Sequence, residues 1–408
     1  MTTRRLVLSQ LALTGRFRPS PKRMVARAMV LALLMGGFAA LGAGQALASH
    51  LDCGDTITTD TKLHRDLVNC PNNGIVIGAD NITLDLNGHT IDGNGELTED
   101  CAPDEICDVG VVNDGHTRVT VTGGSVRQFA EGVLLLGAGH NRLGHLSVSG
   151  NFLRGILIVE SSHTRIEGSA ITRNGLTTDQ AGLVLFTSHN NRIERNRLSS
   201  NGDIGLFSVD DTNDNRIANN TFADNPEAAI LIGGNGNQLT GNRLLRNGDG
   251  IGIAGNHNTI TRNHIADAQT CPEECGIGLG ISIDGGTQNL IAANLVTRIQ
   301  IGIRVEAFAG TTTDNVLRAN VVRAAALDGI AIGLEQGPVT NTLLDRNLAI
   351  GAGDDGIDVD SAATTLTRNL ALRNGDLGIE AVAGVIDGGG NRAAGNGNPA
   401  QCTNVDCT

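Results

Sequence analysis

The stretch AGLVLFTSHNNRIERNRLSSNG, residues 181–202, is one copy of a unit that recurs with drift from about Gly110 to Gly378. Each copy combines a glycine, an alternating aliphatic run and asparagines spaced five residues apart. The copies follow one another at intervals of 21 to 30 residues. Imperfect repetition at such a period is typical of a solenoid, in which each unit stacks on its neighbours.

The aliphatic residues that follow the run indicate how each copy closes on itself. Ile193 and Leu198 lie five residues apart, and the pair Ile217 and Phe222 repeats this offset. In one straight strand an odd offset places two side chains on opposite faces. Both residues reach one core only if the chain bends between them. We therefore predict an all-β solenoid of about 12 coils, with three short strands per coil that pair in parallel with the next coil.

Asparagines recur where the first bend of each copy is expected. Asparagine tolerates unusual backbone angles, and its amide can bond to its copy in the coils above and below. We therefore expect a stacked ladder rather than polar chemistry. Its members are Asn141, Asn191, Asn215, Asn237, Asn258, Asn289, Asn315 and Asn341.

Two further stretches carry a family resemblance. IGADNITLDLNGHTIDGNG, from Ile77 to Gly95, is similar to the first coils of many exported bacterial β-helix proteins, and GGGNRAAGNGNPAQCTNVDC, from Gly388 to Cys407, resembles an ending common among them. With the repeats, they make the chain resemble right-handed parallel β-helix proteins of the pectate-lyase-like superfamily, with repeats of the carbohydrate-binding and sugar-hydrolase type. The resemblance implies a fold that hosts lyases, hydrolases, epimerases and non-catalytic proteins.

The first 48 residues have the composition of an export signal. They contain seven basic residues and no acidic one, followed by an apolar run from Ala28 to Gly44 and a small-residue ending at Ala48. We predict a secretory signal peptide over residues 1–48 and a secreted, periplasmic or cell-surface protein without a membrane span after cleavage. A retained N-terminal anchor is the alternative, although the apolar run is short for a spanning helix.

The charge balance restricts the partners. The chain has a formal net charge of −13, and removal of the basic leader makes the remainder more acidic. Such a balance argues against nucleic acid or an anionic membrane as a partner. We expect an N-terminal cap with the first coils over 49–109, the repeat region over 110–387 and a C-terminal tail over 388–408.

Eight cysteines, an even number, fit disulfides in an exported chain. A zinc site is the weaker alternative, because no second pair of ligands accompanies the cysteine pairs. The cysteines fall into four neighbouring pairs: Cys53 and Cys70, Cys101 and Cys107, Cys271 and Cys275, and Cys402 and Cys407.

An arginine column is expected on the second strand, one residue after each ladder position. Its predicted members are Arg118, Arg142, Arg165, Arg192 and Arg216. Like charges stacked in register repel, so the column favours either an anionic ligand or neutralisation by Glu167 and Glu194. Guanidinium groups suit carboxylates and sulfates, and we predict an acidic polysaccharide as the ligand. A surface ladder of salt bridges is the alternative.

The densest acidic cluster is GAGDDGIDVD, which carries Asp354, Asp355, Asp358 and Asp360. Paired carboxylates could serve as acid and base in a polyuronate lyase or a glycoside hydrolase. The cluster resembles the paired-aspartate motif of polygalacturonases, but neighbouring coils lack that family's other motifs. A turn and surface role is the alternative.

Two metal sites are conceivable. Asp210, Asp211 and Asp214 form an acidic loop that could hold calcium through carboxylates, with a plain acidic loop as the alternative. Histidines at 140, 163, 189 and 257 lie one or two residues before ladder positions, which makes a histidine column for copper conceivable beside ordinary turn residues.

An apolar stripe is expected on the outward face of the first strands. It could dock a protein partner in a structural or adhesive protein, or a loop or the N-terminal segment could cover it. The stripe comprises Leu134, Leu157, Val184, Phe207 and Leu231.

Overall fold

The computed structural model describes residues 51–97, 108–176, 180–209, 211–269, 277–307, 311–333 and 337–408. The chain divides into Met1–Leu51 and Asp52–Thr408, and the fold below is that of the second unit. The predicted signal peptide, Asp210, the pair Cys101 and Cys107, and the pair Cys271 and Cys275 lie outside the described residues. Within the described residues, no helix is long and apolar enough to cross a membrane.

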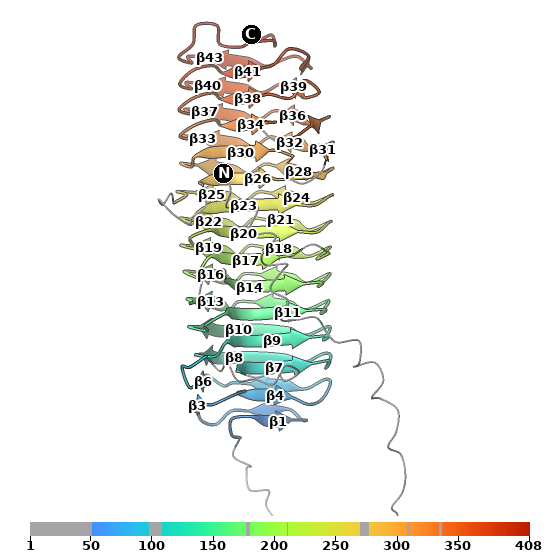
Figure 1. Ribbon diagram of the computed structural model, residues 1–408, viewed down its shortest axis with the longest axis vertical. Helices are drawn as coiled ribbons and strands as arrows, with labels where there is room; N and C mark the ends of the chain where they lie inside the picture. The colour runs from blue at the N-terminus through green and yellow to red at the C-terminus, as the bar shows by residue number, and fades with distance from the viewer. Residues whose placement is uncertain are drawn as a thin grey trace, which may run out of the picture. The chain divides into compact units, whose positions relative to one another are not determined.

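One parallel sheet of 14 strands contains the first strand of every coil, so the unit has about fourteen coils where the sequence predicted about twelve (Figure 1). In spatial order its strands are β1 (Asp55–Ile57), β4 (Ile75–Ile77), β7 (Val109–Asp114), β9 (Glu131–Leu136), β11 (Arg154–Val159), β14 (Ala181–Phe186), β17 (Ile204–Ser208), β20 (Ala228–Gly233), β23 (Asp249–Ala254), β26 (Leu279–Ile283), β30 (Ile301–Val305), β34 (Ile330–Ile332), β38 (Ile357–Val359) and β41 (Ile379–Ala381).

The second strands of the coils stack in the same way. They are β2 (Thr61–Lys62), β5 (Thr83–Asp85), β12 (Arg165–Glu167), β15 (Arg192–Glu194), β18 (Arg216–Ala218), β21 (Gln238–Thr240), β24 (Thr259–Thr261), β28 (Leu290–Ala292), β32 (Val316–Arg318), β36 (Leu343–Asp345), β39 (Thr365–Thr367) and β42 (Ile386–Asp387).

The third strands complete each coil. They are β3 (Leu67–Cys70), β6 (Thr90–Gly93), β13 (Ala170–Thr172), β16 (Arg197–Ser199), β19 (Thr221–Ala223), β22 (Arg243–Leu245), β25 (His264–Ala266), β29 (Leu295–Thr297), β33 (Val321–Arg323), β37 (Leu348–Ile350), β40 (Leu370–Leu372) and β43 (Arg392–Ala394). In two coils one long strand serves as second and third strand: β8 (Thr120–Arg127) and β10 (Arg142–Ser149). A small sheet contains β27 (Gly286–Thr287), β31 (Thr312–Thr313) and β35 (Val339–Thr340).

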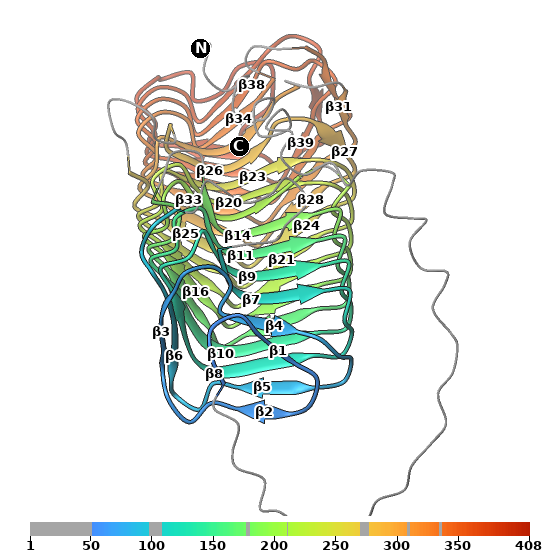
Figure 2. The same ribbon diagram turned by 60° about the horizontal axis from the view of Figure 1, so that its bottom comes forward.

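The parallel stacking confirms the predicted solenoid, and Figure 2 shows its N-terminal coils with β2 beneath β5. The five-residue offset behaves as expected, because Ile193 and Leu198 are both fully buried in the same core. The bend between them is at Arg195, which adopts a φ of 56°. Each coil therefore contributes a few aliphatic side chains to a continuous interior.

Asparagine ladders run along the corners. The backbone N–H of Asn191 donates to Oδ1 of Asn215 at 2.9 Å, and the N–H of Asn215 donates to Oδ1 of Asn237 at 2.9 Å. Because each amide is buried, these bonds satisfy polar groups that would otherwise be costly to bury. Asn341 is an exception to the prediction: it has a φ of 51°, and the buried Thr342 occupies the ladder position.

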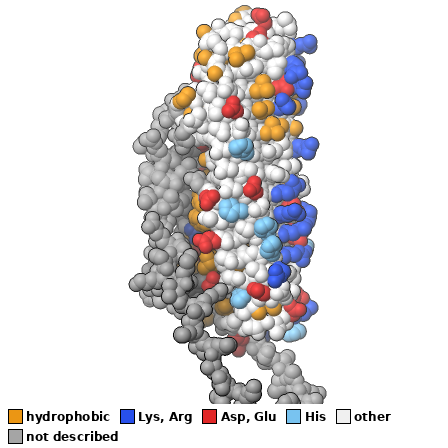
Figure 3. Space-filling model, turned by 90° about the vertical axis from the view of Figure 1, so that its right-hand side faces the viewer, with side chains coloured by type: hydrophobic (Ala, Val, Ile, Leu, Met, Phe, Trp, Pro, Cys, Tyr) orange, Lys and Arg blue, Asp and Glu red, His pale blue; other side chains and the backbone are white. Residues whose placement is uncertain are grey.

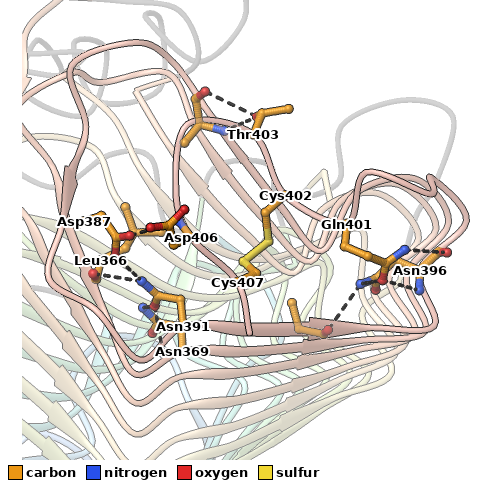
Figure 4. The surroundings of a disulfide bond; sticks show 12 residues. Leu366, Asn369, Asp387, Asn391, Asn396, Gln401, Cys402, Thr403, Asp406 and Cys407 are labelled. Carbon is orange, nitrogen blue, oxygen red and sulfur yellow. Dashed lines mark hydrogen bonds between the residues drawn. A yellow bond between two sulfur atoms is a disulfide. The ribbon is translucent and has the colours of Figure 1, made fainter.

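Disulfides lie at both ends of the described coils. Cys53 bonds to Cys70, and Cys402 bonds to Cys407, which confirms these two predicted pairs. Figure 4 shows the C-terminal bond, whose cysteines extend the stack because Cys402 pairs with Ile379 and Cys407 with Asn391. The tail thus adds a partial last coil that a covalent bond holds closed.

Candidate functional site: an arginine ridge and a carboxylate cluster

The arginine column lies on the second strands. Arg142 pairs with Arg165, Arg165 with Arg192 and Arg192 with Arg216. The four arginines therefore occupy equivalent positions in four successive coils. Adjacent strands lie about 4.8 Å apart, which sets the spacing of the charges. Figure 3 shows Lys and Arg side chains gathered along one edge of the solenoid.

Arg118 is not a member of the column. Thr120, two residues later, pairs with Arg142, and Arg118 lies in the preceding turn with a φ of 58°. Its Nε donates to Oδ1 of Asn81. The prediction placed the ladder position at Thr117, one residue before Arg118, but Val119 takes that position in this coil and donates its N–H to Asn141. Without an asparagine, the sequence offers no marker for the register there.

Glu167 connects three arginines. Its carboxylate lies 2.8 Å from Arg142, 2.7 Å from Arg165 and 2.8 Å from Arg195. Its side chain is 9% exposed. Burial alone would raise the pKa of Glu167, but the Arg142 hydrogen bond and the Arg165 charge together lower it below its ordinary value. Glu167 is therefore ionised at neutral pH and fixes the orientation of three guanidinium groups.

Glu194 makes a second, looser set of ion pairs, with Arg216 at 3.2 Å and Arg165 at 3.6 Å. We call Arg142, Arg165, Arg192, Arg195 and Arg216 the arginine ridge. Its five positive charges share two carboxylates. Arg192 is exposed and has no ion pair with any residue that the structure describes. The ridge is thus locally positive on an acidic chain, although it contains the predicted salt-bridge ladder.

The sequence reasoning missed Arg195. It occupies the turn after β15 and has a positive φ, so its side-chain direction does not follow the alternation of the strand residues from which the column was predicted. The same reasoning missed a second cluster farther along, where Asp345 lies 3.1 Å from Arg318 and 2.8 Å from Arg368. Only the stacking of coils brings these residues together.

The predicted catalytic aspartates lie at the C-terminal coils, on and before the first strands. Asp358 pairs with Glu380 of the next coil, and Asp328 lies one coil before Asp355. Burial raises the pKa of Asp355 to about 8, and a hydrogen bond with Glu380 adds to this. Burial and the charges of Asp360 and Asp328 raise the pKa of Asp358 to about 7.

Hydrogen bonds to the backbone give Asp355 a structural role as well. Its Oδ1 accepts the N–H of Leu377 at 2.7 Å, and its own N–H donates to Asp328 at 3.2 Å. Oxygens of Asp354, Asp355 and Asp376 lie within 4.8 Å of one another. Three such oxygens fit part of a calcium coordination sphere, which takes 6–8 oxygen ligands. Asp328, Asp376 and Glu380 join the cluster through stacking, which the motif GAGDDGIDVD did not reveal.

The calcium prediction at Asp210, Asp211 and Asp214 stays a prediction, because Asp210 lies outside the described residues. Asp211 and Asp214 occupy turn conformations with φ of 63° and 57°. Oδ1 of Asp211 accepts a bond from the Asn213 side chain at 3.2 Å.

The histidine column is shorter than the copper hypothesis requires. The rings of His140 and His163 stack with centroids 4.7 Å apart and planes 15° from parallel. Stacked faces do not converge their nitrogens on one ion. His189 belongs to a neighbouring column, where its Nδ1 accepts the N–H of Asn213.

The apolar stripe is in register but not accessible. Leu134 pairs with Leu157, and the row continues to Leu231. Leu134, Leu157 and Val184 are each 2% exposed, and Phe207 is 4% exposed. These four side chains are therefore buried, and the docking of a protein partner on the stripe stays a prediction.

Comparisons with known proteins bear on the fold. A family model described as right handed beta helix region matches residues 109–255 and 211–374. The tailspike protein of E. coli bacteriophage HK620 in complex with pentasaccharide aligns with a TM-score of 0.61 at 11% identity, covering 86% of this chain and 73% of that one.

Two variants of that tailspike are similar to this chain to the same degree. A double mutant in complex with pentasaccharide aligns with a TM-score of 0.61 at 12% identity, covering 86% of this chain and 73% of that one. A single mutant in complex with pentasaccharide aligns with a TM-score of 0.60 at 12% identity, covering 86% of this chain and 74% of that one. At such identities the likeness concerns the fold alone. No curated protein matches the sequence.

Proposed function

We propose, from the premise that this chain belongs to the right-handed β-helix family, that it binds an acidic polysaccharide along the arginine ridge. The observation that carries the proposal is the excess of five guanidinium groups over two carboxylates, Glu167 and Glu194, on a chain of net charge −13. Like charges stacked on neighbouring strands cost free energy unless opposite charges compensate them. A polyanion with charges repeated along its length would do so.

The ion pairs prepare the ridge for a ligand. Glu167 holds Arg142, Arg165 and Arg195 in fixed orientations, so less conformational entropy is lost when their remaining N–H groups meet an anion. A guanidinium group presents five donors in a rigid fork, so one carboxylate contact leaves others available. The ridge therefore combines rigidity with unsatisfied hydrogen-bonding capacity.

A different column of the same molecule shows what a neutral arrangement looks like. Asp224 binds Arg246 through two bonds of 2.8 and 2.9 Å, and Asp267 binds Arg298 in the next pair of coils. Acid and base alternate there, one for one. The ridge lacks this balance, and the difference supplies a control for mutagenesis.

The test is binding of polygalacturonate to the purified chain, measured by affinity electrophoresis at rising salt concentration. We expect binding to weaken with salt, because exposed charges are screened beyond about 10 Å at 0.1 M salt. Binding should also fall strongly in the Arg192→Ala/Arg195→Ala variant, because this variant lacks two of the five guanidinium groups of the ridge. The matched control is Arg246→Ala/Arg298→Ala, which removes two guanidinium groups from the balanced column. Equal binding by wild type and the ridge variant would refute the proposal.

A second candidate function rests on the carboxylate cluster. With a pKa of about 8, Asp355 carries a proton at neutral pH, next to the carboxyl group of Glu380. A protonated carboxylic acid beside ionised carboxylates is the arrangement of general acid and base in glycoside hydrolysis. Because the cluster would repel a polyanion, this candidate takes a neutral polysaccharide as substrate.

Its test is the release of reducing ends from neutral polysaccharides. We expect release to decline above pH 7 to 8, as the acid loses its proton, and to be abolished by Asp355→Asn, with Asp211→Asn as the surface control. Unchanged release by Asp355→Asn, in a variant with wild-type thermal stability, would rule this candidate out.

A further inference from the structure

A hollow of about 420 Å³ lies at the corner between third and first strands, on the N-terminal coils. Its volume is within the range of small-ligand sites, 300–1,000 Å³. It belongs neither to the arginine ridge nor to the carboxylate cluster. The lining residues are Gly95, Arg127, Gln128, Ser149, Gly150, Phe152, Arg173 and Leu176.

A missing side chain forms the hollow. Gly150 occupies the same turn position as Gln128 in the coil before and Arg173 in the coil after, and all three adopt positive φ, of 69°, 62° and 56°. A Cβ on Gly150 would meet no atom within 4 Å. The side chains of Gln128 and Arg173 are therefore two coil steps apart, about 9.6 Å between backbones. The space above Gly150, between these two side chains, is a slot for one flat ring.

One wall of the slot is apolar and half-exposed. Phe152 is half-buried, and its backbone N–H donates to Phe129 of the preceding coil while its carbonyl accepts the N–H of Leu176 in the next coil. Leu176 beside it is 59% exposed. The chain contains no tyrosine or tryptophan, so phenylalanine is its one residue type with an aromatic hydrocarbon ring. The C–H face of a pyranose ring suits such a wall.

The other wall is cationic. Arg127 is held by Asp92 through two bonds of 3.0 Å, which offsets its charge and fixes its position. Arg173 is exposed and makes no ion pair with the described residues. Arg173 is thus the group available for an anionic ligand, and a carboxylate matches the guanidinium fork.

We propose that this hollow binds one carboxylated sugar residue, with its ring against Phe152 and its carboxylate on Arg173. The inference rests on the proposed function in one respect: the sugar residue belongs to the same acidic polysaccharide. Between the ridge and the hollow, β10 carries the exposed His145, and beyond it the outward positions of β10 and β13 carry the small side chains Ser147, Ser149, Ala170 and Thr172.

The test uses the full chain and a trimer of galacturonic acid, with the methyl ester of the same trimer as the uncharged probe, in isothermal titration calorimetry. We expect the trimer to bind and Gly150→Gln to weaken binding by about tenfold or more, a loss of about 1.4 kcal/mol. Gln128 shows that this turn accepts glutamine. Gly351→Gln fills the corresponding turn position of a distant coil, where φ is 65°, and should leave binding unchanged.

Arg173→Gln should remove the preference for the acid over the ester while retaining binding to Phe152. Absence of trimer binding, or equal binding by wild type and Gly150→Gln, would overturn this inference, and polygalacturonate binding that depends on Arg192 and Arg195 would still support the ridge. The converse result, trimer binding sensitive to Gly150→Gln without dependence of the polymer on the ridge, would support the hollow and refute the ridge.

Discussion

Replacement of Glu167 by glutamine tests whether the ridge is held by its buried carboxylate. Three guanidinium groups contact Glu167 at 2.7 to 2.8 Å, with their own side chains 46%, 40% and 57% exposed. An exposed ion pair contributes about 0.2–1 kcal/mol, and breaking a fully buried one costs about 3–5 kcal/mol. Since the carboxylate is buried and its partners are half-exposed, we expect Glu167→Gln to lower the free energy of unfolding by about 2 kcal/mol at pH 7.

The effect must depend on pH with a definite sign. The pKa of Glu167 is lower in the folded chain than its ordinary value, 4.5, so the unfolded state binds more protons in acid. The stabilisation is therefore present above pH 4.5 and is lost as the pH falls through the folded pKa. The difference between wild type and Glu167→Gln should shrink towards zero in strong acid.

The assay is urea denaturation of wild type and Glu167→Gln at pH 7 and at pH 3, followed by circular dichroism. Asp224→Asn, which breaks the exposed pair with Arg246, is the control and should have a much smaller effect. A pH 7 difference no larger than that of the control, or one that persists undiminished at pH 3, would refute the reasoning.

Three further outcomes are expected from denaturation measurements. Because the pKa of Asp358 is raised to about 7 in the fold, its ionisation costs stability as the pH rises from about 4 to 7, so Asp358→Asn should be more stable than wild type at pH 8 and lose that advantage at pH 4. Asn220→Ala removes two buried bonds of 2.8 Å to the preceding coil and one of 3.1 Å to the next, and should cost about 3 kcal/mol, whereas Asn235→Ala, on an exposed ladder, should cost much less. Replacing both Cys402 and Cys407 by alanine opens a loop of sequence separation 5 and should cost about 2 kcal/mol, detected as earlier unfolding of the C-terminal coils.

Part of the site follows from the sequence and part does not. The row Arg142, Arg165, Arg192 and Arg216 could be predicted because an asparagine or a threonine precedes each arginine at the same distance. Arg118 shows the same local pattern, because Thr117 precedes it, but Val119 holds the ladder position in that coil, so the apparent register is wrong by two residues. The domain division and the export signal stay predictions.

The apolar and asparagine periods by themselves determined the fold of this protein. They are local properties: in each copy, bends five residues apart and a core residue on each short strand leave stacked coils as the arrangement that buries the aliphatic side chains together. The tertiary structure alone decided which charges meet. Glu167 reaches Arg142 and Arg195 from coils 25 and 28 residues away, and Asp355 reaches Glu380 across one coil step. These contacts depend on turn geometry, which sets side-chain direction, and on burial, which shifts the pKa. The spacing of residues along one coil predicts neither the turn geometry nor the burial.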